Sequence, residues 1–269
     1  MDAHCETCDL KHNGFQMSPI KLVQGQTGAS LMYRISRSTW FLMFSFLGLA
    51  VVSVFAATAS STIGGVAWRK PIVGAIFSLV CFLGIVAGLF PSKCSSMFHF
   101  RRSAQKSVSS NPGRSMEASK FRGHHPDCPE FRAHVFQMGS RVLCAGCTGL
   151  ILGALLSIAT VTMYFFLDQP LSLDPQLIFS VGFLGVSCGL LQYHVFNLHR
   201  SSIHLFVNVL FVFGVSLLLV GVDAIDQSIN ADFYVIGLSL FWLYTRILLS
   251  QIDHQKICFD CSLEECVFH

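Results

Sequence analysis

Charged residues are scarce in this chain. Only 12% of its 269 residues are Asp, Glu, Lys or Arg, whereas a soluble domain carries about 25%. Hydrophobic residues make up 52% of the sequence, which argues against a single water-soluble globule. The net charge is only +3, so bulk charge indicates no nucleic-acid-binding face. The sequence also lacks a phosphate-binding glycine loop, a nucleophile elbow and a metalloprotease His-Glu-x-x-His motif, so it indicates neither a nucleotide nor a peptide substrate.

Long apolar runs are what the sequence has instead. A bilayer core about 30 Å thick is crossed by about 20 apolar helical residues, and six runs reach that length. The sequence therefore predicts an all-α, polytopic integral membrane protein embedded in a lipid bilayer, with five or seven spans as the alternatives. Because 39 residues carrying both charge signs precede the first run, we expect that run to be a span and not a cleaved signal peptide. The expected spans are 40–59, 71–90, 148–167, 177–197, 203–222 and 233–251.

Lys and Arg are unevenly distributed over the connections. The N-terminal tail carries four and the connection 91–147 carries nine, whereas the opposite side has only Arg69 and Lys70. Because basic residues stay on the cytoplasmic side of a membrane, both termini are expected in the cytoplasm, with Asp223 and Asp226 as ordinary charges on the outer surface. The predicted organisation is a cytosolic tail (1–39), two spans (40–90), a cytosolic basic linker with a Cys/His motif (91–147), four spans (148–251) and a cytosolic cysteine-rich tail (252–269).

Cysteine and histidine residues gather on the expected cytosolic face. In the connection 91–147, Cys144 and Cys147 precede the third span with two residues between them. Such a pair can hold one metal ion in a tight turn, and Cys128 with a neighbouring histidine, His125 or His134, completes four tetrahedral ligands. Because structural disulfides are not expected in a reducing cytosol, the spacing favours zinc, with iron as the second metal and simple loop thiols as the alternative.

Two further groups have ligand-like spacing. The C-terminal group either closes its own metal site or joins Cys144 and Cys147, and acylation of the tail is the alternative. The N-terminal group lies close to a chain end, where spurious metal capture is the competing explanation. The C-terminal group consists of His254, Cys258, Cys261, Cys266 and His269, and the N-terminal group of His4, Cys5, Cys8 and His12.

The segments between and within the spans carry weaker signals. The serine-rich basic stretch 101–123 predicts a disordered or membrane-attracted linker. Residues 129–138 predict a short helix, with Pro129 at its first position and Gly139 after its end. Three glycine pairs with small-xxx-small spacing predict close helix contacts, which are also compatible with a helix-mediated oligomer. The pairs are Gly84 and Gly88, Gly149 and Gly153, and Gly185 and Gly189.

Some polar side chains fall inside the expected spans, where burial in lipid is costly. Two interpretations stay open. In one, these side chains and the nearby His199 and His204 line a vestibule at the inner face. In the other, the histidines reach headgroup water and Arg246 snorkels to the surface. The residues concerned are Gln192, His194, Asn208 and Arg246.

The region before the third span resembles a known family. Cys128, Phe131-Arg132, Gly139, Leu143-Cys144-Ala145-Gly146-Cys147-Thr148-Gly149 and Gly153 are similar to the signature of small polytopic membrane proteins of unknown function from bacteria and archaea. That signature has a Leu-x-Cys-Ala-x-Cys-Thr-Gly element at the start of a transmembrane helix, and the similarity covers about thirty residues. Gly146 stands where a basic residue is expected. The resemblance implies a metal- or thiol-bearing membrane protein and no particular reaction.

Three functions follow from these patterns. The first is a binding or regulatory membrane protein whose cytosolic face holds zinc. The second is a membrane enzyme in which an open metal site or the Cys144 and Cys147 dithiol acts on a lipid-soluble substrate, since a helix N-terminus stabilises a thiolate. The third, ranked last, is a cation transporter that uses the histidines of the fourth and fifth spans.

Overall fold

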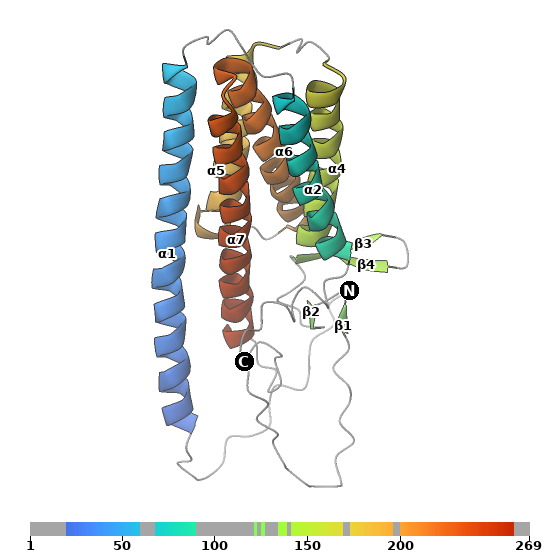
Figure 1. Cartoon of the computed structure of the whole chain (residues 1–269). Coiled ribbons are helices and arrows are strands. Elements are labelled where there is room, and N and C mark those ends of the chain that lie inside the picture. The colour runs from blue at the N-terminus through green and yellow to red at the C-terminus, as the bar shows by residue number, and fades with distance from the viewer. Residues whose placement is uncertain are drawn as a thin grey trace, which may run out of the picture.

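The chain forms a bundle of long helices that run up and down between two ends (Figure 1). The computed structural model describes residues 20–59, 68–89, 121–122, 125–126, 134–138, 141–168, 173–195 and 200–260. Within them lie the helices α1 (Ile20–Thr58), α2 (Arg69–Leu89), α4 (Ala145–Val161), α5 (Pro175–Val195), α6 (Ser201–Asp226) and α7 (Ile229–Asp260), and the π-helical segment η2 (Thr162–Phe166). The strands are β1 (Phe121–Arg122), β2 (His125–Pro126), β3 (Val135–Met138) and β4 (Arg141–Cys144).

Six helices in the described part of the chain are long and apolar enough to cross a membrane, as the sequence predicts. The expected span limits differ from the observed limits by only a few residues at most ends. We call the end of the bundle next to β3 and β4 the hairpin end, and the opposite end, where α2 begins, the Arg69 end. The spanning segments are Ser38–Thr58, Arg69–Leu89, Ala145–Phe166, Pro175–Tyr193, Ser201–Asp226 and Ile229–His254.

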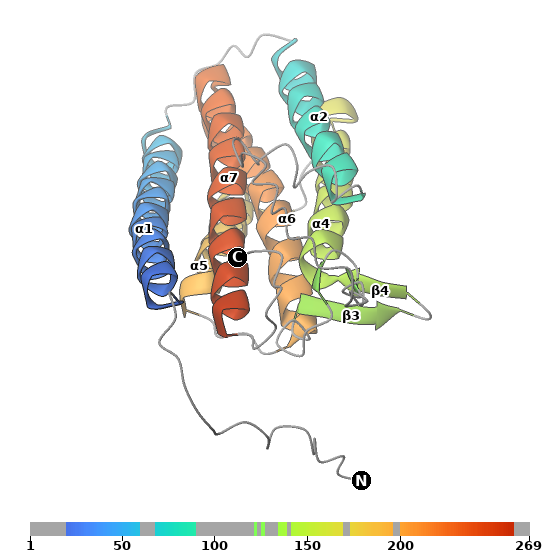
Figure 2. The same cartoon turned by 90° about the horizontal axis from the view of Figure 1, so that it is seen from below.

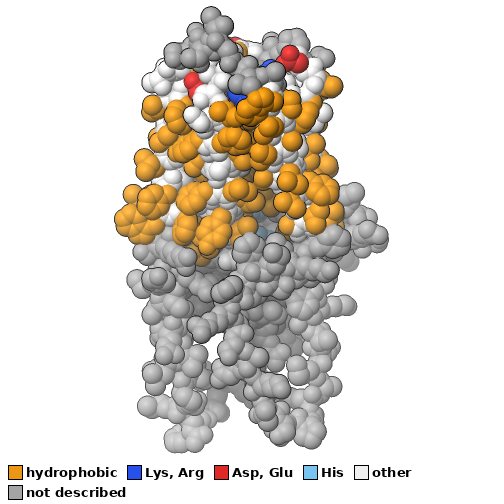
Figure 3. Space-filling model, in the orientation of Figure 1, with side chains coloured by type: hydrophobic (Ala, Val, Ile, Leu, Met, Phe, Trp, Pro, Cys, Tyr) orange, Lys and Arg blue, Asp and Glu red, His pale blue; other side chains and the backbone are white. Residues whose placement is uncertain are grey.

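The outward faces of the helices are apolar. Large hydrophobic side chains form a band around the visible face of the bundle, and charged side chains gather near the Arg69 end (Figure 3). A contiguous exposed apolar surface of this extent is unfavourable in water and matches the hydrocarbon core of a bilayer. The chain is therefore a polytopic integral membrane protein. Exposed side chains from all six spans include Leu47, Phe82, Leu155, Leu184, Phe206 and Leu240.

Helix α6 is the centre of the bundle. It packs against α4, α5 and α7, whereas α1 lies at the margin beside α7 (Figure 2). Within the most apolar 18-residue stretch of α6, 61% is buried inside the protein, compared with 22% in the corresponding stretch of α2. Side chains on almost every face of α6 therefore meet protein, and its polar groups are available to three neighbouring helices.

Glycines allow α4 and α5 to approach α6 closely. A Cβ atom on Gly149 would lie 2.5 Å from the main-chain oxygen of Leu205, and one on Gly185 would lie 2.8 Å from that of Leu210. The predicted contacts of the pairs Gly149/Gly153 and Gly185/Gly189 are thus confirmed, and α6 is the partner of both. For the third pair the prediction is confirmed at Gly88, which packs on the side chain of Ile151, and wrong at Gly84, which is surrounded by open space.

The segment before the third span is a β-hairpin and not the end of a helix. Strands β3 and β4 pair antiparallel, with Val135 opposite Cys144 and Met138 opposite Arg141. The predicted helix 129–138 is therefore wrong at its C-terminal part, and its first residues lie outside the described ones. The physical signal is a short, mostly apolar run that contains a valine on each side of the dipeptide Gly139-Ser140, with Phe136 in the first run, a spacing typical of two-residue hairpins. The short strands β1 and β2 also pair antiparallel.

The glycine contacts with α6 give a direct test. In Gly149→Ala the new methyl group meets main-chain oxygen that cannot move without shifting α6, so we expect a loss of about 1–3 kcal/mol of stability. Thermal unfolding in detergent measures this as a lower melting temperature. Gly84→Ala is the matched control, because its methyl group enters open space and removes a helix-weakening glycine. Equal melting temperatures for the two variants would contradict the close packing of α4 on α6.

Candidate functional site

A buried arginine marks the hairpin-end half of the bundle. Arg246, in α7, is only 4% exposed. Its Nη2 atom donates hydrogen bonds of 2.6 Å to Oε1 of Gln192 and to Oδ1 of Asn208, and its Nη1 atom donates to the main-chain oxygen of Gly189. These acceptors lie on α5 and α6, so the guanidinium joins three helices. All three acceptors are neutral oxygens.

The expectation that Arg246 snorkels to the membrane surface is therefore wrong. The side chain points into the bundle, where the rings of Phe211 and Tyr193 lie 4.9 and 5.5 Å from its guanidinium carbon. Aromatic faces attract a cation that has left water. Main-chain, amide and aromatic groups together replace the water that snorkelling would have supplied.

Arg246 also determines how the next residues are hydrogen-bonded. Because a guanidinium only donates, the atom of Gln192 that faces Arg246 must be Oε1, and its Nε2 faces Nδ1 of His204 at 2.6 Å. An amide nitrogen also only donates, so Nδ1 of His204 is the acceptor. The neutral His204 ring then carries its hydrogen on Nε2. The orientation of one arginine thus assigns the tautomer of a histidine that it does not touch.

Three histidines from distant parts of the sequence meet at the hairpin end. We call His134, His204 and His254, together with Asp253, the histidine cluster. The ring of His134 lies 4.7 Å from that of His204 and 5.3 Å from that of His254, centroid to centroid. Nε2 of His134 lies 3.6 Å from Oδ2 of Asp253. The hairpin supplies one histidine, α6 the second and α7 the third, so the cluster exists only in the folded chain.

The Cys144 and Cys147 pair lies where strand β4 of the hairpin runs into α4. Cys144 ends β4 and precedes the first residue of α4, and Cys147 lies in the first turn of that helix. The main-chain oxygen of Cys144 accepts a 2.9 Å hydrogen bond from Thr148. The hairpin register puts Cys144 opposite Val135, the residue after His134. The predicted position of both thiols at a helix N-terminus is therefore observed, and each is half-buried.

The structure brings only part of the predicted metal group together. His134 and His254 meet, and His204, which we assigned to a vestibule, joins them, so the predicted vestibule and the predicted metal motif meet in one place. Among the described residues, no three His, Cys, Asp or Glu side chains form a group that could hold a metal ion. The N-terminal group and the side chains of His125, Cys128, His194, His199, Cys258, Cys261, Cys266 and His269 lie outside the described residues.

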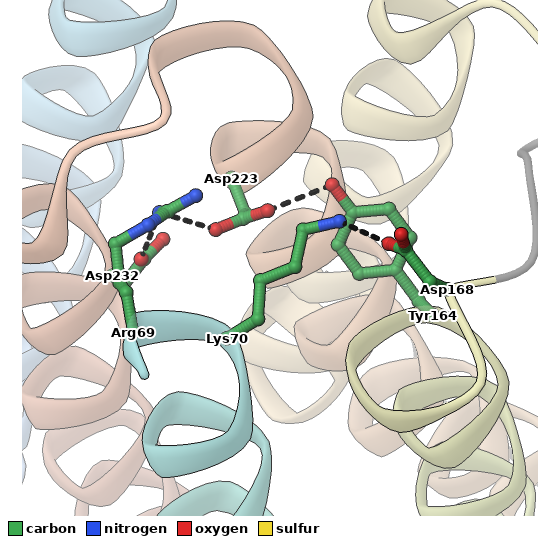
Figure 4. Close-up of polar contacts among 6 residues, drawn as sticks. All are labelled: Arg69, Lys70, Tyr164, Asp168, Asp223 and Asp232. Atoms are coloured by element: carbon green, nitrogen blue, oxygen red, sulfur yellow. Dashed lines mark hydrogen bonds and ion pairs between the residues drawn. The ribbon is translucent and has the colours of Figure 1, made fainter. Parts of the chain in front are cut away.

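A second buried polar group lies at the Arg69 end. We call Arg69, Tyr164, Asp223 and Asp232 the Arg69 cluster (Figure 4). Nη1 of Arg69 contacts Oδ2 of Asp232 at 2.6 Å and also forms an ion pair with Oδ1 of Asp223. The hydroxyl of Tyr164 donates a 2.7 Å hydrogen bond to Oδ2 of Asp223. The expectation that Asp223 is an ordinary surface charge is thus wrong, since it is 1% exposed.

The π-helical segment η2 aims Tyr164 at this cluster. At its end, the main-chain nitrogen of Leu167 bonds to the main-chain oxygen of Thr162, five residues earlier. A π-helical turn takes up more residues than an α-helical turn and so changes which side chains face inward. Both Tyr164 and Phe165 are buried here. Such turns are frequent at functional sites.

An exposed ion pair lies next to the buried one. Lys70 follows Arg69 in α2, and its Nζ lies 2.6 Å from Oδ1 of Asp168 and 4.8 Å from the centre of the Tyr164 ring. The hydrogen bond from Lys70, aided by its positive charge, holds the pKa of the Asp168 carboxyl below its ordinary value. Because the Asp168 side chain is 81% exposed, solvent screens this pair and it contributes little to stability.

Several site residues were missed by sequence reasoning. Asp253 follows the apolar run 233–251, and Asp223 and Asp232 each lie one residue outside a predicted span. Arg69 precedes the run 71–90 by two residues. The available signal was electrostatic: Arg69, Asp223 and Asp232 all fall at the same expected end of the bundle with opposite charges.

Comparison with protein-family models, with curated proteins and with solved structures gives no match. The buried polar groups are therefore the basis for inferring the function.

Removal of the Arg246 guanidinium should destabilise the bundle. In Arg246→Met the amide oxygens of Gln192 and Asn208 and the carbonyl of Gly189 lose their common donor, and we expect a loss of about 3–5 kcal/mol because buried polar groups stay unpaired. Arg200→Met is the matched control, since Arg200 is exposed before α6. Thermal unfolding in detergent compares the two. If Arg246→Met unfolds at the same temperature as Arg200→Met, the hydrogen-bond network of Arg246 does not stabilise the bundle.

The adjacent residues Arg69 and Lys70 give an internal comparison. Arg69→Met leaves the carboxyl groups of Asp223 and Asp232 buried without their guanidinium, which should cost about 3–5 kcal/mol. Lys70→Met removes only an exposed pair and should cost at most about 1 kcal/mol. Melting temperatures of the two variants measure the difference. Equal losses would mean that the cluster is not buried as described.

Proposed function

We propose that this chain is an integral membrane protein that binds a transition metal ion, zinc in the first instance, at the hairpin end of its helix bundle, and that it has a binding or regulatory role. The observation that carries the proposal is that the fold places His134 directly before the strand that pairs with Cys144, and Cys147 in the helical turn that follows. Imidazole and thiolate groups are common zinc ligands. His204, His254 and Asp253 lie around His134.

The donor atoms suit zinc. Cys144 and Cys147 offer two sulfur ligands in one turn, and His134 lies just before the strand that pairs with Cys144. Cys128, which precedes this hairpin in the sequence, is the proposed fourth ligand, with His125 as its substitute. A set of three thiolates and one imidazole is a frequent structural zinc site. Iron is the second metal that such donors accept.

His254 and Asp253 have a supporting role in this proposal. Nε2 of His134 faces the carboxylate of Asp253, so His134 is proposed to bind the metal through Nδ1. A carboxylate on the second nitrogen orients a histidine ligand and increases its basicity. His254 packs edge-on against the same ring. His204 keeps its hydrogen on Nε2 through Gln192 and Arg246, so it acts as a positioning residue.

The hairpin end is proposed to face the cytoplasm. The connection 91–147 and both tails belong to this end, and they carry most of the Lys and Arg residues outside the spans. Basic residues remain on the cytoplasmic side. The reducing cytosol then keeps Cys144 and Cys147 as thiols that can bind metal.

A thiol-redox function is the second candidate, and the position of Cys144 and Cys147 at the start of α4 favours it. The positive end of a helix stabilises a thiolate. In that function the two thiols form one disulfide, and two electrons and two protons pass to a lipid-soluble acceptor of the quinone class. A structural zinc site and this reaction exclude each other, because both use the same sulfur atoms.

Metal analysis of the purified protein tests the proposal. We expect about one zinc ion per chain, lost in the double variant Cys144→Ser plus Cys147→Ser and reduced in His134→Ala. Cys188→Ser is the matched control, because Cys188 is half-buried within α5 and should not affect zinc. Equal zinc content in wild type and double variant would reject the site. Thiol titration of the same preparation identifies the redox alternative: a metal-free protein whose two thiols disappear under oxidation and return on reduction favours the dithiol.

A further inference from the structure

The Arg69 cluster holds more negative than positive charge. Asp223 and Asp232 share the single guanidinium of Arg69, and Tyr164 is a neutral donor. Both carboxyl groups are fully buried. With both ionised, the cluster carries one uncompensated negative charge in an apolar interior, which is strongly unfavourable. One bound positive charge would balance it.

Neighbouring groups do not provide that charge. Lys70 lies over the Tyr164 ring and pairs with Asp168, so this second pair balances itself. Figure 4 shows the two pairs side by side, with the Lys70 nitrogen next to the Tyr164 ring and Asp168. In the part of the chain that the structure describes, the charged and titratable groups around the cluster are Arg69 and Lys70 from α2, Tyr164 from η2, Asp168 after it, Asp223 from α6 and Asp232 from α7.

Two oxygen atoms show where the missing positive charge belongs. Oδ1 of Asp223 and Oδ1 of Asp232 are buried. The first is held in the ion pair with Nη1 of Arg69, whereas Oδ1 of Asp232 accepts no hydrogen bond from the described residues. The other oxygen of each acid is occupied, by the Tyr164 hydroxyl and by Arg69 respectively. Both carboxyl groups contact the same Nη1 atom of Arg69, so they lie next to each other. Buried acceptors without a donor are rare and costly.

We propose that Asp223 and Asp232 together bind one proton, which exchanges with the aqueous phase at the Arg69 end. With the proton bound, the cluster contains one guanidinium, one carboxylate and one carboxylic acid, so its charge is zero. The acid hydrogen also supplies the hydrogen-bond donor that Oδ1 of Asp232 lacks. Adjacent carboxyl groups that share a proton in this way behave as one titrating unit.

The proton would hold together the ends of four elements. Arg69 begins α2, Asp223 lies in the last turn of α6, Asp232 in the first turn of α7, and Tyr164 in η2. When the proton leaves at alkaline pH, the two carboxylates repel each other and this end of the bundle loosens. Relative to the unfolded chain, where both acids ionise in their ordinary acidic range, the stability contributed by the bound proton is fully present at acidic pH, declines as pH rises and is fully lost once the folded protein has released the proton. This site is separate from the proposed metal site and does not depend on it.

Infrared spectroscopy of the purified protein in a lipid nanodisc detects the proton directly. We expect a carboxylic-acid C=O band at neutral pH that shifts in D2O and disappears on alkaline titration. Both Asp223→Asn and Asp232→Asn should lose this band, because the single remaining carboxylate is balanced by Arg69 and needs no proton. Asp168→Asn is the matched control and should keep it, since Asp168 is exposed and belongs to the outer pair.

The pH dependence of thermal unfolding is the second measurement. The melting temperature of wild type and of Asp168→Asn should fall as pH rises towards the loss of the band and then level off, whereas that of Asp232→Asn should lack this fall. Asparagine has the shape of a protonated aspartate, so the variant is expected to fold.

Three results would overturn the proposal. One is the absence of the acid band from the wild type at neutral pH. Another is a band that survives in both Asp223→Asn and Asp232→Asn. The third is a neutral-pH melting temperature that falls when sodium is replaced by choline, in which case a metal cation occupies the pair.

Discussion

A charge that is buried among apolar helices must find its partner atoms on other helices, and this requirement determines how the bundle is assembled. Arg69 and Arg246 lie near opposite ends of the protein, and each is satisfied in part by α6, through Asp223 and through Asn208. Helix α6 therefore has to be central. The glycines of α4 and α5 allow the close approach that brings these short polar side chains within reach of the guanidinium groups.

The spans could be predicted because bilayer thickness and apolar composition determine them, whereas the polar sites could not be predicted in the same way. Hydropathy places a span boundary where the first charged residue occurs. The predicted spans accordingly stop before Asp223 and begin after Asp232, although both helices continue through these residues. Hydropathy alone does not reveal the oppositely charged partner that allows a charge to be buried, because that partner is distant in the sequence.

The hairpin-end site shows a similar division. The positions of Cys144 and Cys147 at a helix start followed from the sequence, because an apolar run begins directly after them. The hairpin did not, because helical spacing of Phe131, Val135 and Met138 competed with strand propensity over the same residues. The meeting of His134 with His204 depends on that hairpin. The sequence thus singled out the three histidines as candidates in separate groups, but their meeting required the fold.

The π-helical segment η2 has a consequence for the evolution of this chain. A π turn is equivalent to one residue inserted into an α-helix, and one α-helical residue corresponds to a rotation of about 100° around the axis. Deletion of Thr162 or Met163, with regular α-helix restored, would rotate the Tyr164 side chain by about 100° around the helix axis and turn its hydroxyl away from Asp223. The length of this stretch, and not only its composition, is thus constrained by a hydrogen bond to a helix nearly sixty residues away.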